Sequence, residues 1–108
     1  MTKVFWFSRH DMSDTQKQAL ITKLGQVDIV QSDKTIKNAF EVKDDINNAD
    51  VIAIVAPINI QAQFLKIAGD KPVIMAVNDR VAKLDGGYDF VFKKWIRLRK
   101  IEVVTEDF

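Results

Sequence analysis

Polar side chains that could bind a phosphate group follow three of the apolar runs in this sequence. Ser8, Arg9 and His10 follow the first run, Asn59 lies shortly after the third, and Asn78 and Arg80 follow the fourth. Arginine presents a planar fork of N–H donors that suits phosphate oxygens, and histidine can serve as a general acid or base near neutral pH. The predicted ligand-binding residues are Ser8, Arg9, Asn59, Asn78 and Arg80, and the predicted catalytic residues are His10 and Arg9.

Four apolar runs must position these residues, and they predict strands near 3–8, 27–31, 50–56 and 72–78. The runs over 51–55 and 73–77 are continuous and rich in β-branched residues rather than alternating. Such runs are typical of parallel strands that are buried on both faces. The residues expected to be nearly fully buried are Ile52, Ile54, Ile74 and Val77.

The segments between the strands have helical spacing and predict helices near 13–24, 34–48 and 59–68. Ser13 to Gln16 has the form of a capping box, and Gly25 and Gly69 are suited to end the first and third helices. In the second segment one face is expected to be apolar, with Ile36, Ala39, Phe40 and Ile46.

This alternation of strands and helices predicts a single α/β domain over 1–108, of the doubly wound, Rossmann-like or flavodoxin-like type with three layers. Its mostly parallel sheet should have the order 2-1-3-4, followed by a variable C-terminal edge. There Asp85 to Tyr88 reads as a turn, and Phe90–Phe92 and Ile101–Val104 are candidates for one or two further strands. In such a sheet ligands bind at the carboxyl ends of the strands, between strands one and three.

The sequence lacks the residues that several classes of functional site require. The chain has no cysteine and one histidine, so we expect neither disulfides nor a metal site. No glycine-rich dinucleotide or P-loop motif is present, so no cofactor is expected. A net charge of +1 gives no global case for nucleic acid or a membrane surface. The basic run Lys93–Lys100, which includes Trp95, reads as a solvated edge strand more readily than as a nucleic-acid site. No apolar run approaches a membrane span, and the N-terminus does not read as a signal peptide, so we expect a cytoplasmic protein.

Two resemblances bear on the first strand. Arg9-His10 after a strand resembles the phosphohistidine phosphatases, but Asp11 replaces their glycine and their second histidine is missing. Residues 4–10, which end in Ser8-Arg9-His10, resemble the opening of a small CRISPR-associated family grouped with the ring nucleases. That resemblance implies a Rossmann-like domain that recognises or cleaves cyclic oligoadenylate, with Ser8, Arg9 and His10 at the phosphodiester or ribose. The whole chain also resembles small uncharacterised proteins of Gram-positive phages and mobile elements.

These observations leave three functions open. The first is binding of a nucleotide-like or other phosphorylated small ligand, and the second is its cleavage by a metal-independent phosphodiesterase. The third is that of a phage or mobile-element accessory protein that binds another protein and has no small-molecule site. Pairing of edge strands, or docking of the C-terminal segment, would also make a homodimer easy to form.

Overall fold

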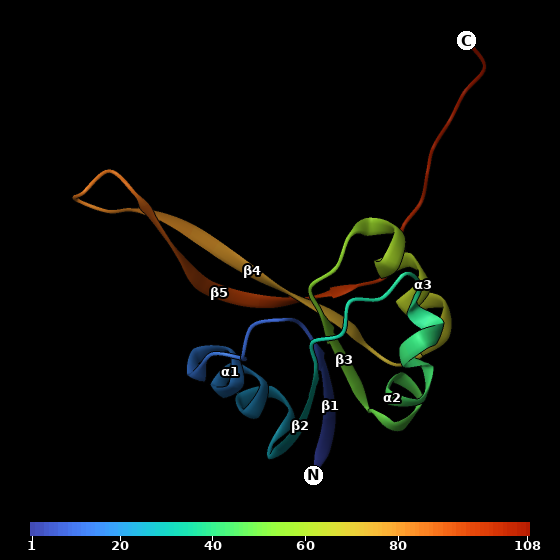
Figure 1. The fold of residues 1–108 in the computed structure, drawn as a ribbon, viewed down its shortest axis with the longest axis horizontal. Coiled ribbons are helices and arrows are strands. Elements are labelled where there is room, and N and C mark those ends of the chain that lie inside the picture. Colours follow the sequence, from blue (N-terminus) through green and yellow to red (C-terminus); the bar gives the residue numbers. More distant parts are fainter.

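A five-stranded sheet with the order β2-β1-β3-β4-β5 organises the computed structural model, which describes residues 1–108 (Figure 1). The strands are β1 (Thr2–Phe7), β2 (Val27–Ser32), β3 (Val51–Ile54), β4 (Val73–Ala82) and β5 (Tyr88–Leu98). The first four are parallel, and β5 runs antiparallel to β4 at the edge. The predicted α/β class and the order 2-1-3-4 are therefore confirmed, and the C-terminal edge is antiparallel.

Helices cover both faces of this sheet (Figure 1). On one face, Leu20 of α1 (Asp14–Leu24) packs with Trp6, Ala53 and Ile74. The other face is covered by the short 3-10 helix η1 (Ala39–Val42), by α2 (Lys43–Asn48) and by α3 (Ile58–Ala68). The predicted capping box of α1 is present, since the Ser13 hydroxyl accepts from Gln16 N–H and the Gln16 side chain accepts from Ser13 N–H. No helix of the structure has the length and apolar character needed to cross a bilayer.

The centre of the core lies on β3. Ile52 and Ile54 are at most 1% exposed, and Ile74 on β4 is 9% exposed, as expected. Val77, also expected to be buried, is only half-buried. The reason is that β4 pairs with β3 only over Val73 and Ile74 and then leaves the body of the protein with β5 as its only neighbour.

The second predicted helix is wrong over its first part, since the chain from 33 to 38 is irregular and helical structure begins at Ala39. Asn38 caps η1, and its side chain accepts from Phe40 N–H at 3.0 Å. The carboxylate of Glu41 in turn accepts from Asn38 N–H. The Phe40 side chain, expected to face inward, is 58% exposed.

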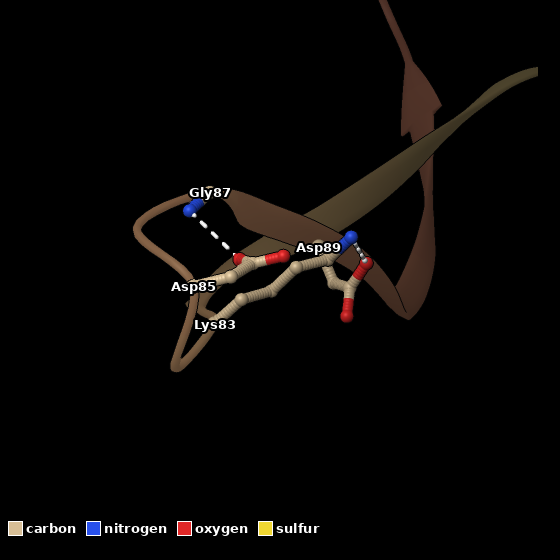
Figure 2. Close-up of polar contacts among 4 residues, drawn as sticks. All are labelled: Lys83, Asp85, Gly87 and Asp89. Carbon is tan, nitrogen blue, oxygen red and sulfur yellow. Dashed lines mark hydrogen bonds and ion pairs between the residues drawn. The ribbon is translucent and has the colours of Figure 1, made fainter.

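Beyond the body, β4 and β5 continue as a twisted two-stranded hairpin, here called the arm (residues 78–92; Figure 1). Its strands pair from Asn78 with Phe92 to Ala82 with Tyr88, after a bulge at Val77/Asn78. Figure 2 shows its tip, where Lys83 Nζ lies 3.2 Å from the Asp89 carboxylate and Gly87 N–H donates to Asp85 at 3.1 Å. The predicted turn and the strand at 90–92 are confirmed. The candidate strand at 101–104 is not formed, and residues 99–108 extend away from the body.

Candidate functional site

A cavity of about 360 Å³ lies at the carboxyl ends of β1, β2 and β3. This is the point where the strand order reverses, because β1 is flanked by β2 on one side and by β3 on the other. Three loops and the start of α3 supply the lining, which consists of Phe7, Ser8, Arg9, His10, Ser32, Asp33, Lys34, Thr35, Ile36, Val55, Ala56, Pro57 and Ile60.

The first wall, Ser8 to His10, is fixed by side chains on both sides of it. The indole Nε1 of Trp6 donates to the His10 carbonyl at 2.8 Å. The Gln31 amide donates to the carbonyls of Ser8 and His10 at 3.0 and 3.1 Å. The Ser8 side chain is buried, and its hydroxyl oxygen accepts from His10 N–H at 3.1 Å. This loop is therefore held in one conformation, while the Arg9 and His10 side chains remain exposed.

The second wall is the irregular segment after β2, and Arg9 bridges to it. The guanidinium Nη2 of Arg9 donates to the Thr35 hydroxyl at 2.6 Å. Further along, the Glu41 carboxylate accepts from Lys37 N–H at 2.7 Å and from Asn38 N–H at 3.2 Å. These two backbone bonds lower the pKa of Glu41 below its ordinary value. The Glu41 carboxylate thus fixes the backbone at the end of the irregular segment that carries Asp33 to Ile36.

The third wall is the turn from β3 into α3. The buried Gln61 side chain donates to the Ala56 carbonyl at 2.7 Å and so fixes this turn. Pro57 is the N-cap residue, and no side chain caps the helix. The backbone N–H groups of Ile58 and Asn59 have no hydrogen-bond partner. Free N–H groups and the positive end of the helix dipole favour an anion at this position.

The charges around the cavity also favour an anion. Arg9 and Lys34 bring positive charge to its lining, His10 adds a group that can be protonated, and Asp33 is the one carboxylate. No three histidine, aspartate or glutamate side chains gather anywhere in the structure as a metal-ion site would require. The lining therefore carries more positive than negative charge, with Arg9 and Lys34 against Asp33.

Not all predicted site residues reach this cavity. Ser8, Arg9 and His10 line it, but Asn59 is exposed on the first turn of α3 and does not. Asn78 and Arg80 are exposed on the arm, where the Arg80 guanidinium lies 4.3 Å from the Tyr88 ring centre. Of the predicted site residues, Asn59, Asn78 and Arg80 therefore lie outside this cavity. Strand β4 does not end beside β3 but continues to Ala82, so Asn78 and Arg80 lie away from the strand ends that form the cavity.

Residues 33–36 also line the cavity, although 34–36 were expected to begin the second helix and none of the four was among the predicted site residues. The sequence does contain a signal for this irregular segment, because Asn38 and Glu41 have the spacing of a capping box and set the helical start after Asn38.

Comparisons with known protein families, curated proteins and solved structures find no match for this chain.

Proposed function

We propose that the cavity binds a phosphorylated small ligand, either a nucleotide or one nucleotide unit of a larger molecule. The observation that carries the proposal is the Ser8–His10 loop, which is fixed by hydrogen bonds from Trp6 and Gln31 and lines the cavity together with Pro57 and Ile60 at the start of α3. A phosphate there would receive donors from Arg9, Lys34 and the start of α3. The strand order, with helices on both faces, supports a doubly wound, Rossmann-like classification, in which ligands bind at this switch point.

The size of the cavity limits what fits inside it. Its volume of about 360 Å³ lies near the lower end of small-molecule sites, which span roughly 300–1,000 Å³. The apolar lining from Phe7, Val55 and Ile60 would face a base or sugar, while the polar loops face phosphate. A mononucleotide would place its base or sugar against the apolar lining and its phosphate against the polar loops. A cyclic oligonucleotide would place one nucleotide unit in the cavity and leave the others outside.

An enzymatic form of the proposal uses the same residues without a metal ion. A ribose 2′-hydroxyl of the bound ligand loses its proton to solvent water and attacks the adjacent 3′-phosphorus, the bond from phosphorus to the departing 5′-oxygen breaks, and a 2′,3′-cyclic phosphate forms. Arg9 stabilises the charge that develops on the phosphate oxygens, and protonated His10 gives its proton to the departing oxygen. The resemblance of residues 4–10 to the ring-nuclease group makes cyclic oligoadenylate the substrate to test first.

Thermal melting tests the binding proposal, with AMP, inorganic phosphate and cyclic tetra-adenylate as probes. A ligand at about 100 times its Kd adds about 2.7 kcal/mol of stability, which for a domain of this size raises Tm by roughly 10 °C. Arg9→Ala should abolish this rise and change the stability of the free protein by no more than about 0.5 kcal/mol, because Arg9 is exposed.

Arg99→Ala is the matched control, because Arg99 is also exposed and does not line the cavity. It should leave the ligand-induced rise in Tm unchanged. Binding at this site is rejected if no probe raises Tm, or if Arg9→Ala keeps the full rise.

Product analysis tests the enzymatic form. Incubation with cyclic tetra-adenylate, followed by chromatography, should show linear products ending in a 2′,3′-cyclic phosphate. His10→Ala should keep the rise in Tm and lose turnover. If the wild-type protein binds the probe but never cleaves it, the phosphodiesterase is rejected and ligand binding remains.

The accessory-protein function is a second candidate, and the exposed arm favours it. The arm offers apolar side chains to another protein on a part of the chain that contributes nothing to the cavity.

A further inference from the structure

The two faces of the arm differ in what their side chains offer to a partner. Residues that alternate along a strand, and the residues directly opposite them, share one face of a sheet. One face, here called the aromatic face, carries an alternating row of rings from β5 together with their direct partners on β4, in the pairs Tyr88 with Ala82, Phe90 with Arg80, and Phe92 with Asn78. Arg80 is therefore the charged residue of a face that holds three aromatic rings.

The carboxylates of the two arm strands lie on the opposite face. They occur in the pairs Asp79 with Val91 and Asp89 with Val81, each one residue out of step with the aromatic row. Positive and negative charge are thus separated between the two faces of the arm. A phosphate group that approaches the rings meets Arg80 and no carboxylate of β4 or β5.

The rings of the aromatic face are open to solvent. Tyr88 is 54% exposed and Phe90 is 74% exposed. The Arg80 guanidinium lies 4.3 Å from the Tyr88 ring centre, so a planar cation lies within the row. A row of exposed rings marks an interaction surface rather than the ordinary scatter of apolar residues.

This row is continuous with the α1 side of the core. The ring centres of Phe92 and Trp95 lie 5.6 Å apart, and those of Trp95 and Trp6 lie 5.9 Å apart. Trp95 Nε1 also donates to the Gln16 carbonyl of α1 at 3.0 Å. The base of the arm is therefore anchored to the body, with its aromatic face on the α1 side.

A groove of about 340 Å³ lies on the same side, between α1 and β5. Its charged lining contains no carboxylate and consists of Lys23, Lys93, Lys94 and Arg97. Helix α1 carries one carboxylate, Asp14, against two lysines, Lys17 and Lys23. The aromatic face thus continues into a groove of the same positive sign.

The acidic end of the chain lies apart from this surface. Glu102, Glu106 and Asp107 follow β5, and residues 99–108 leave the body beside α3, at the opposite end of the molecule from the arm (Figure 1). The sequence alone favoured a solvated edge strand for Lys93–Lys100, because spacing does not show which residues share a face with this run. In the structure the row of rings and part of the basic run lie together on the α1 side.

We propose that the aromatic face and the α1–β5 groove together bind single-stranded nucleic acid. The rings of Phe90 and Phe92 stack on bases, and Arg80 and the cations of the groove bind phosphates. Surfaces for single strands combine stacking rings with a positively charged groove that follows the backbone. A duplex does not suit this surface, because its bases are stacked on one another and do not present their faces to a ring.

Area and charge decide between nucleic acid and a protein, the second candidate above, as the partner of this face. An aromatic side chain buries about 200 Å², so the exposed parts of Tyr88 and Phe90 amount to roughly 250 Å². A stable protein interface buries about 800 Å² per partner, whereas a stacked base needs only one exposed ring. A two-fold dimer through this face would also bring two surfaces of the same positive charge together.

Fluorescence anisotropy tests the proposal with two labelled probes of about 12 nucleotides, oligothymidylate and oligouridylate, a length within the range that single domains bind. The wild-type protein should bind at least one of them, and the tighter probe distinguishes DNA from RNA as the source of the strand. With three or four cations at phosphates, a fourfold rise in salt should weaken binding by roughly 20–50-fold.

Replacements at Phe90 separate stacking from simple apolar contact. Phe90→Leu keeps an apolar side chain but removes the ring, so it should weaken binding at least about fivefold. Phe90→Tyr keeps the ring and should bind as the wild type does. The matched control is Phe40→Leu on η1, where the phenylalanine is 58% exposed and lies away from the arm; it should not change binding.

A second pair of variants tests the charge. Arg80→Gln should lower the slope of log affinity against log salt by about 0.7, the value for one phosphate contact of a single strand. Lys43→Gln is its control, because Lys43 is exposed at the start of α2 on the other side of the sheet. It should leave the slope unchanged.

Failure of this proposal is distinguishable from failure at the cavity. Phe90→Leu should keep the rise in Tm that AMP causes, because Phe90 does not line the cavity. The proposal is overturned if neither probe binds, or if Phe90→Leu binds as tightly as the wild type. A wild-type protein of twice the chain mass of 12.3 kDa that binds neither probe and becomes monomeric with Phe90→Leu would assign the row to a protein partner instead.

Discussion

The replacement Ile52→Ala tests whether β3 is the centre of the core. Ile52 is fully buried, pairs with Phe5 of β1 and Val73 of β4, and belongs to the apolar cluster under α2 and α3. The replacement removes three carbon groups, each worth about 0.8 kcal/mol when buried. Because a cavity is left in a close-packed sheet, the total loss should be about 2–5 kcal/mol.

Urea unfolding monitored by circular dichroism measures this loss, and Tm should fall by roughly 10–20 °C. Ile52→Val is a graded control that should cost about 0.5–1.5 kcal/mol. Ile58→Ala makes the same chemical change at a side chain that is 67% exposed, and it should cost no more than about 0.5 kcal/mol. A loss below about 1 kcal/mol for Ile52→Ala would show that β3 is peripheral and would remove the basis for the sheet described above.

Two further predictions concern contacts that position the site and the arm. Glu41→Gln should lower stability at about pH 7, because the lowered pKa means that folding favours the ionised carboxylate. This contribution is present above the ordinary pKa of 4.5 and is lost as the pH falls below it. Urea melts at about pH 7 and about pH 3 should therefore show the difference from wild type shrinking in acid, and a constant difference would contradict it. Trp95→Phe keeps a ring at the base of the arm but removes the bond to the Gln16 carbonyl, so it should cost about 0.5–1.5 kcal/mol in the same assay.

The parallel part of the sheet could be predicted because its signal is local. The runs at 51–55 and 73–77 are continuous and β-branched, and only strands with both faces covered favour that composition. The punctuation by Ser13, Gly25 and Gly69 also has a direct physical cause, and the structure has helix ends at each of these residues. The predicted start of the second helix was wrong because the apolar spacing extends across residues 33–38, whereas the capping box of Asn38 and Glu41 determines where the helical turns begin.

The site could be predicted only as far as it depends on strand order. Ser8, Arg9 and His10 follow β1, whose end lies at the switch point whatever the remaining strands do. Asn78 and Arg80 were assigned to the same edge on the assumption that β4 ends level with β3. The length of β4 depends on its pairing with β5 across the turn at Asp85 to Tyr88, a contact between distant segments that spacing within one run does not reveal.

The extension of β4 also explains why the two proposed functions occupy different parts of the molecule. Strands β1, β2 and β3 end together and enclose the cavity, whereas β4 pairs with β3 over only Val73 and Ile74 before it enters the arm. No residue of the arm lines the cavity. The arm is anchored to the body through Trp95, whose Nε1 donates to the Gln16 carbonyl of α1, and α1 does not line the cavity either. A change confined to the arm should therefore leave ligand binding at the cavity unchanged.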